Sequence, residues 1–184
     1  MRVLLAKNSG FCFGVRRAVE LAEKLADPAE TVYTYGHIIH NTGVVEDLCA
    51  RNVVPVESLD EIPVGCTLII RAHGAPPSVY AACAEKGIRI VDATCPFVKR
   101  IHNIARQAQQ QGRRVLIAGK ADHPEVVGIR GCAGEDAIVI ESVADAKRLM
   151  PMAQATLVAQ TTLPQAAYDE ICQALSAVVT DLAI

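Results

Sequence analysis

Cys95 is the residue of this sequence whose setting most directly suggests chemistry. It lies between an apolar run at residues 88–91 and a helical pattern that begins at Pro96. Because proline suits the first position of a helix, Cys95 is predicted at the carboxyl end of a strand and the amino end of a helix. That position favours the thiolate, which binds metals and attacks electrophiles. On this stretch alone, simple packing in the strand-to-helix turn is an equally good interpretation.

Most of the other reactive side chains also follow predicted strands. They are Cys12 after residues 3–6, His37 and His40 after 32–35, His73 after 67–70, His123 and Glu125 after 114–118, and Thr161 after 155–159. Open parallel α/β sheets bind ligands at the carboxyl edge, so we expect these side chains to share one region. Any one histidine could be structural, and the shared placement is what favours a site. His102 falls inside a helical pattern and is interpreted as a surface or packing residue.

These residue types define what such a site could do. Histidines can hydrogen-bond to anionic oxygens, and helix amino ends add backbone N–H donors. Glu125 could serve as a general acid if burial raises its pKa, and Thr161 could pass a proton or orient a hydroxyl. The thiolates of Cys12 and Cys95 suit a soft metal or an iron–sulfur cluster.

The other cysteines show no metal-binding spacing. The sequence has seven cysteines, an odd number, in a chain that does not look secreted, so a disulfide framework is not expected. The absence of a CxxC pair disfavours a zinc ribbon and a thioredoxin-type motif. Four cysteines are interpreted as core or packing residues: Cys49, Cys66, Cys83 and Cys172. Cys132 is expected in a loop.

Composition excludes several classes of protein. Hydrophobic residues make up 51% of the 184 residues and aromatic residues only 4%, which predicts an aliphatic core. The net charge of −2 gives no reason to expect a nucleic-acid partner. No apolar run is long enough to span a bilayer, and the first apolar run is too short for a signal peptide. We therefore expect a cytoplasmic protein without a nucleic-acid or membrane partner.

Strand and helix patterns alternate along the chain, which predicts a parallel α/β architecture. Strands are expected at residues 3–6, 32–35, 53–56, 67–70, 88–91, 114–118, 137–140 and 155–159. Helices are expected over residues 15–25, 45–49, 77–83, 96–111, 143–150 and 164–178.

Two short segments of the sequence are similar to each other. Residues 114–118 read Arg-Val-Leu-Ile-Ala, close to Arg-Val-Leu-Leu-Ala at residues 2–6, and each run leads into a polar loop that contains glycine. Chance similarity between two buried strands is the competing explanation. We predict two similar α/β domains, residues 1–97 and residues 98–184, each a small parallel sheet flanked by helices.

Taken in order, six motifs resemble those of the 4-hydroxy-3-methylbut-2-enyl diphosphate reductases, the LytB/IspH family. The matching segments are GFCFGV at residues 10–15, HN at 40–41, AHG at 72–74, DATCP at 92–96, HPE at 123–125 and QTTL at 160–163. Each is weak alone, whereas the ordered set spans almost the whole chain and is highly specific. The resemblance implies reductive removal of an allylic hydroxyl in the non-mevalonate isoprenoid pathway, giving isopentenyl and dimethylallyl diphosphate.

The resemblance also implies a cofactor and an electron donor. The family uses an oxygen-sensitive 4Fe-4S cluster that is held by three cysteines and leaves one iron open to the substrate oxygen. Cys12 and Cys95 would be two of those ligands. The electrons would come from ferredoxin or flavodoxin.

The remaining motif residues would handle the substrate. By the same resemblance, His40, His73 and His123 would hold the diphosphate of the small allylic substrate. Glu125 would deliver protons, and Thr161 would help to place the substrate hydroxyl.

The sequence departs from the family in one respect. Family members have three similar domains, and the motifs here are those of the first two. The third cysteine ligand and a loop rich in Ser and Asn belong to later segments, and Cys172 lies in a helical pattern without the motif of that ligand. We therefore expect the 184-residue chain to be a truncated form that binds no stable cluster and turns over little substrate.

Two other functions stay open. Histidine-lined loops could hold a diphosphate without any catalysis, which would make the protein a binding module. Alternatively, Cys12 and Cys95 could serve a zinc or redox-thiol protein.

Overall fold

The structure is a computed structural model that describes residues 3–4, 7 and 9–184. The strand predicted at residues 3–6 is wrong at its first two positions. Val3 and Leu4 are 68% and 79% exposed and belong to no strand. Residues 5 and 6 lie outside the described residues. An apolar run becomes a strand only where neighbouring strands can pair with it, and no described strand pairs with Val3 or Leu4.

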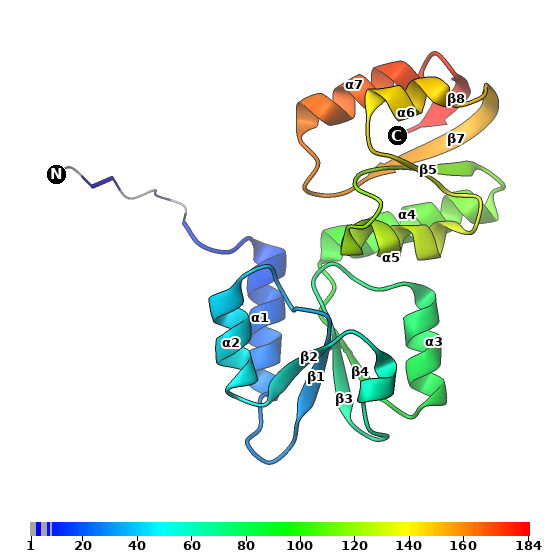
Figure 1. Ribbon diagram of the computed structural model, residues 1–184. Helices are drawn as coiled ribbons and strands as arrows, with labels where there is room; N and C mark the ends of the chain where they lie inside the picture. Colours follow the sequence, from blue (N-terminus) through cyan, green and yellow to red (C-terminus); the bar gives the residue numbers. More distant parts are fainter. Residues whose placement is uncertain (1–2, 5–6, 8) are drawn as a thin grey trace.

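Four parallel strands form the first sheet, in the order β2-β1-β3-β4 (Figure 1). They are β1 (Val32–Tyr35), β2 (Val53–Val56), β3 (Thr67–Ile70) and β4 (Arg89–Asp92). Helices α1 (Phe13–Leu25) and α2 (Thr42–Cys49) pack on one face, and α3 (Pro77–Glu85) packs on the other. All four residues of β3 are buried, because a central parallel strand is covered on both faces.

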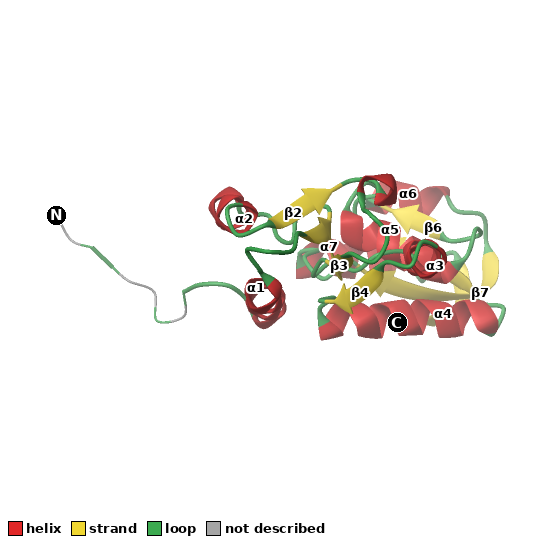
Figure 2. Cartoon of the chain, turned by 90° about the horizontal axis from the view of Figure 1, so that it is seen from below, coloured by secondary structure: helices red, strands yellow, loops and turns green. Residues whose placement is uncertain are grey.

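The second sheet repeats this topology, with the order β6-β5-β7-β8. Its strands are β5 (Arg114–Ala118), β6 (Ile138–Ile140), β7 (Met152–Ala159) and β8 (Val179–Ala183). Helices α4 (Pro96–Gln110) and α5 (Pro124–Ala133) cover one face, and α6 (Val143–Arg148) and α7 (Gln165–Leu175) cover the other. The molecule thus has two similar α/β domains, with α4 and α5 lying between the sheets (Figure 1), and Figure 2 shows the helices and strands from below. The predicted boundary after residue 97 falls in the first turn of α4 and stays a prediction.

The end of the chain differs from the prediction of one helix from Pro164 to Val178. Helix α7 ends at Leu175 and the chain returns as β8, in which Val179 lies opposite Met152 of β7. This pairing joins residues far apart in sequence, so local periodicity did not predict it.

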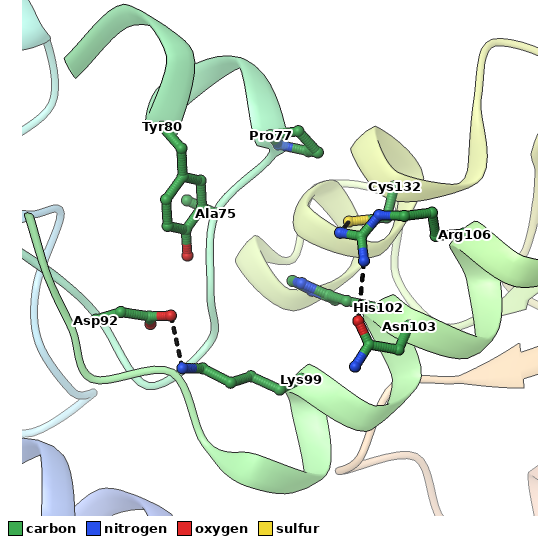
Figure 3. Close-up of a pocket in the computed structure, with 9 residues that line it drawn as sticks. All are labelled: Ala75, Pro77, Tyr80, Asp92, Lys99, His102, Asn103, Arg106 and Cys132. Carbon is green, nitrogen blue, oxygen red and sulfur yellow. Dashed lines mark hydrogen bonds and ion pairs between the residues drawn. The ribbon is translucent and has the colours of Figure 1, made fainter. Parts of the chain in front are cut away.

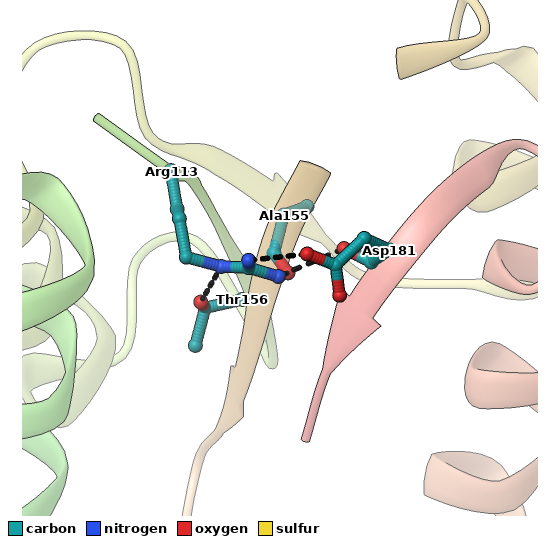
Figure 4. A network of polar contacts seen from close by, with 4 residues as sticks. All are labelled: Arg113, Ala155, Thr156 and Asp181. Atoms are coloured by element: carbon teal, nitrogen blue, oxygen red, sulfur yellow. Dashed lines mark hydrogen bonds and ion pairs between the residues drawn. The ribbon is translucent and has the colours of Figure 1, made fainter. Parts of the chain in front are cut away.

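Arg113 joins β8 to the second sheet through hydrogen bonds and an ion pair (Figure 4). Its Nη1 lies 2.6 Å from an Asp181 carboxylate oxygen, and its Nη2 donates to the carbonyl of Asp181 at 2.8 Å. Its Nη2 also donates to the Ala155 carbonyl at 2.7 Å, and its Nε to the Thr156 hydroxyl at 3.0 Å. One guanidinium therefore joins β7 to β8 through several donors in a fixed geometry.

Helix α5 was not predicted, and the expectation of a loop at Cys132 is wrong. Cys132 lies in α5 and is 7% exposed. Gly128 and Gly131 obscure the helical pattern, but both allow close packing. A Cβ at Gly131 would lie 2.7 Å from the Cβ of Pro76 in the first domain. These glycines are therefore tolerated inside a helix because another segment packs against them.

The other cysteines interpreted as core or packing residues, and His102, agree with that interpretation in most cases but not in all. Cys83 is buried, and Cys66 and Cys172 are partly buried against the cores. Cys49 is exposed, so its interpretation as a core residue is wrong; α2 is short and buries only Leu48 fully. His102 is 8% exposed, which makes it a packing residue and not a surface one.

No helix in the described part of the chain is both long and apolar enough to cross a membrane.

Candidate active site

Three histidines from the two domains meet at one point. His40 lies in the loop after β1, His73 follows β3, and His123 lies directly before α5. Their ring centroids are 4.9 Å apart for His40 and His73, 5.4 Å for His73 and His123, and 6.1 Å for His40 and His123. One ring nitrogen from each lies within 4.8 Å of the others. The predicted convergence of strand-end histidines therefore holds for these three; His37 is exposed and is not part of the cluster.

Helix amino ends hold two of the three histidine loops in place. Asn41 caps α2, its Oδ1 accepting from the Val44 N–H at 3.1 Å, directly after His40. His123 itself caps α5, and its Nδ1 accepts from the Glu125 N–H at 3.1 Å. A neutral imidazole that accepts at Nδ1 carries its hydrogen on Nε2. His123 can therefore offer an N–H donor at Nε2, which suits an anion better than a metal ion.

The local electrostatics disfavour the charged form of two of these rings, His73 and His123. Burial, followed by the charges of His40, Arg71 and His123, lowers the pKa of His73 to about 4. Burial is also the main cause that lowers the pKa of His123, with smaller contributions from His40 and Arg71. The Nδ1 of His73 is buried and has no hydrogen-bond partner among the described residues. A ligand at this point would meet two hydrogen-bonding rings, His73 and His123, whose charged forms are disfavoured.

A buried carboxyl group lies in the first turn of α5, two residues after His123. Glu125 is 1% exposed, and its two oxygens accept from the Thr161 backbone N–H at 2.7 Å and from the Thr161 hydroxyl at 2.9 Å. Burial raises the pKa of Glu125, although both bonds from Thr161 act in the opposite direction. A carboxyl group with a raised pKa, hydrogen-bonded to a hydroxyl, is suited to donate a proton.

Cys12 and Cys95 are the N-cap residues of α1 and α4, and both line a cavity of about 730 Å³. A Cβ at Gly14 would lie 2.6 Å from the Cys95 sulfur, so the glycine leaves the room that this thiol occupies. Thr161 also lines the cavity and thereby connects it to Glu125.

The donor set fits a metal–sulfur group in type and in position, but it is small. Thiolates at helix amino ends are soft ligands in a favourable electrostatic position. Within the described part of the chain, no third cysteine lines this cavity. Much of its wall is apolar and open to solvent, with Phe13 and Phe97 63% and 65% exposed.

A second cavity, of about 320 Å³, lies among α3, α4 and α5 and contains none of the predicted site residues (Figure 3). Its charged groups bond mainly to one another. Lys99 lies 2.6 Å from an Asp92 oxygen, and Arg106 donates to the Asn103 side chain at 2.9 Å and contacts the Cys132 sulfur at 3.6 Å. The ion pair of Lys99 with Asp92 joins α4 to β4, the two contacts of Arg106 lie within the second domain, and none of them gives a sign of a ligand.

The sequence interpretation missed one charged residue at the histidine cluster. Arg71 directly follows β3, two residues before His73, and its charge lowers the pKa values of His73 and His123. The signal that could have indicated Arg71 is its place directly after a predicted strand, the same signal that indicated the histidines.

Comparison with known proteins adds a decisive observation. The sequence model of the LytB protein family matches residues 3–184. This chain belongs to the LytB family. The family predicted from the sequence motifs is therefore confirmed.

Curated relatives in this family are named 4-hydroxy-3-methylbut-2-enyl diphosphate reductase. One from a Thermoanaerobacter species is 39% identical over 186 residues, which cover 99% of this chain and 65% of the relative. Another, from Aquifex aeolicus, is 40% identical over 174 residues, which cover 92% of this chain and 60% of the relative. The chain thus spans less than two thirds of the length of these relatives.

Two solved structures have the same fold. One, described as (E)-4-hydroxy-3-methyl-but-2-enyl diphosphate reductase, the terminal enzyme of the non-mevalonate pathway, has a TM-score of 0.83 and 37% identity, covering 98% of this chain and 66% of that one. The Plasmodium falciparum E-1-hydroxy-2-methyl-but-2-enyl-4-diphosphate reductase has a TM-score of 0.86 and 30% identity, covering 96% and 57%. The predicted α/β architecture of two similar domains is confirmed.

Proposed function

We propose that these residues form two domains of a 4-hydroxy-3-methylbut-2-enyl diphosphate reductase, which yields isopentenyl and dimethylallyl diphosphate. The observation that carries the proposal is the meeting of His40, His73 and His123 from both sheets, close in the chain to a buried Glu125–Thr161 pair. That pair in turn adjoins the cavity lined by the two thiols. Anion donors, a proton donor and soft metal ligands are the three components that this reduction needs.

The histidine cluster would bind the diphosphate. Each imidazole can donate an N–H to an anionic oxygen, and the Nε2–H of His123 is held for that purpose by its capping bond at Nδ1. Clustered histidines at this spacing could also hold a metal ion. The capping bond favours the anion, because binding of a metal at Nε2 would require moving the hydrogen to Nδ1 and losing the cap.

The Glu125–Thr161 pair would deliver protons. Replacing the allylic hydroxyl by hydrogen consumes two electrons and two protons and releases one water molecule. Because burial raises its pKa, the Glu125 carboxyl group holds its proton to higher pH than an exposed glutamate does. The Thr161 hydroxyl, 2.9 Å from that carboxyl, would orient the departing oxygen and pass the proton.

A 4Fe-4S cluster, when bound, would supply one-electron transfer and Lewis acidity at the substrate oxygen. Cys12 and Cys95 would hold it through their sulfur atoms. Because the described residues bring two thiols to the cavity, we expect a polypeptide of these 184 residues alone to retain little iron and to show little turnover. Ferredoxin or flavodoxin as electron donor and a cytoplasmic location remain predictions.

Two alternatives lead to different measurements. A diphosphate-binding module would bind the substrate by titration calorimetry but would show no turnover even when joined to the remaining part of a relative. A zinc or redox-thiol protein would contain stoichiometric zinc without iron or sulfide.

The test is anaerobic cluster reconstitution followed by an iron count and a visible spectrum, with a full-length relative as the positive control. We expect substrate binding in both proteins, and a stable cluster with turnover only in the relative. Full activity of the 184-residue polypeptide, or its failure to bind the substrate, would contradict the proposal.

A further inference from the structure

Arg71 carries a partly buried guanidinium group without a partner. Its Nε is buried, and none of its nitrogens forms a hydrogen bond or ion pair with any described residue. The guanidinium carbon lies 5.9 Å from the centroid of the Tyr35 ring. Glu57 acts on Arg71 electrostatically without forming an ion pair. A guanidinium remains charged in proteins and has five N–H donors, and leaving the buried Nε–H without an acceptor is unfavourable.

The space that Arg71 occupies is built into the neighbouring loop. A Cβ at Gly36 would lie 2.3 Å from Nη1 of Arg71, so only glycine leaves room for the guanidinium. Gly36 has φ of +65°, its N–H donates to the Val56 carbonyl at 2.8 Å, and its carbonyl accepts from the Thr34 hydroxyl at 2.8 Å. These bonds hold the backbone of Gly36 in a conformation that favours glycine, and so keep open the space that the guanidinium occupies.

Arg71 is connected with two of the clustered histidines through the loops that carry them. It comes from the loop that carries His73, and it packs against the loop that leads to His40. Its charge acts on His73 and on His123 of the second domain. Because these rings are neutral near pH 7, the histidine donors alone do not balance a diphosphate, which carries several negative charges. A fixed cation is the component that is missing from the cluster.

We propose that Arg71 is that cation, an anion-binding residue that stabilises the charge of the bound diphosphate. The assignment rests on the proposed function and deepens it. The anion would also relieve the unpaired state of the guanidinium, because phosphate oxygens match its planar donors. Lys120, the other cation that acts on His123, is exposed and is screened by solvent.

Calorimetric titration of the metal-free 184-residue protein with inorganic pyrophosphate tests the assignment. We expect Arg71→Gln to weaken binding about 10- to 100-fold and to reduce its dependence on salt, as for a lost charge-assisted hydrogen bond. Arg71→Lys keeps the charge but loses the planar donors, so its affinity should lie between those of the wild type and of Arg71→Gln, with a salt dependence near that of the wild type. The matched control is Arg89→Gln, which removes an exposed cation paired with Glu30 at the opposite end of the first sheet and should leave binding unchanged.

A second readout tests whether the charge of Arg71 acts on the histidine rings. Because Arg71 lowers the pKa of His73 and of His123, Arg71→Gln should raise both in an NMR titration of the imidazole protons, while Arg89→Gln should not. His40, Lys120 and Asp122 also act on these rings and stay in place in both variants.

The outcomes separate the two proposals. Wild-type binding that Arg71→Gln leaves unchanged, with unmoved imidazole titrations, overturns the role of Arg71 and leaves the proposed function intact. Absence of pyrophosphate binding in the wild type removes the proposed function and this assignment with it. If Arg71→Gln does not fold, Arg71→Lys decides: weaker binding with a salt dependence near that of the wild type supports the assignment, and loss of both in a folded Arg71→Lys protein overturns it.

Discussion

The histidine cluster and the cysteine cavity lie at the same end of the sheets but differ in how far the described residues equip them. At the cluster, one nitrogen from each of three rings lies within 4.8 Å of the others, and the partly buried cation Arg71 acts on His73. At the cavity, two thiols face a wide and largely apolar space. The proposed anion site therefore uses side chains already held in place, whereas the proposed metal–sulfur site has two thiols among the described residues. The two activities should be separable by experiment.

The largest expected effect separates the two regions directly. Replacing His40, His73 and His123 together with alanine should weaken pyrophosphate binding by more than about 100-fold, since each lost hydrogen bond to a charged ligand contributes about 1.5 kcal/mol or more. Cys12→Ser with Cys95→Ser should leave that affinity within about 2-fold of the wild type, by the rule that separate sites act independently. Calorimetry at one pH and salt concentration measures both. Equal losses in the two variants would mean that the regions form a single site.

A smaller effect concerns pH and the stability of the histidine region. The folded pKa of His73 is about 4, below its usual value of 6.5, so its neutral form stabilises the fold above pH 6.5 and this contribution is lost as pH falls from 6.5 toward 4. The loss should reach about 2 kcal/mol, allowing for the partial exposure of the ring. Urea unfolding of the wild type and of His73→Asn at pH 7.5 and 4.5 measures it. The variant should show a clearly shallower pH dependence; matching curves would contradict the burial argument.

The cysteine region can be probed through Gly14. Alanine there brings a Cβ to within 2.6 Å of the Cys95 sulfur, and we expect net destabilisation of about 1 kcal/mol, overpacking being partly offset by the better helix propensity of alanine. Cys95→Ala should relieve most of that loss, which a double-mutant cycle by urea unfolding would detect. Additive effects would show that the two residues do not share this space. Pyrophosphate affinity should stay unchanged throughout.

The smallest effect separates the capping role of His123 from its role in binding. His123→Ala should lower the free energy of unfolding by about 1 kcal/mol, because α5 loses its N-cap. His123→Asn should keep the stability, since asparagine is a good cap, but should lose the anion donor as alanine does. Thermal unfolding and pyrophosphate titration of the two variants give the comparison. Full binding by His123→Asn would remove this ring from the anion site.

Local sequence signals predicted much of the fold, and long-range contacts explain the failures. Buried parallel strands such as β3 and β5 are continuous apolar runs, and prolines mark the starts of α3 and α4. Helix α5 was hidden by glycines whose value lies in packing against another domain. Strand β8 depends on pairing with β7 and on the contacts of Arg113. Neither the packing of α5 against the first domain nor the pairing of β8 with β7 leaves a periodic pattern in the sequence.

The candidate site was predictable because strand ends converge in parallel sheets. The sequence placed the histidines at strand ends, and the topology of two sheets brings three of them together. It did not place Arg71, because the features that set this arginine apart are its burial, its missing partner and the space left by Gly36. These are properties of two loops packed together and are absent from either segment alone.

The most direct test of the central claim is a calorimetric titration of the metal-free 184-residue protein with pyrophosphate at pH 7.5. We expect one-to-one binding without any added metal, because the histidine donors and the cation Arg71 are already in place. Absence of binding until zinc is added would contradict it and would make the three histidines a metal site.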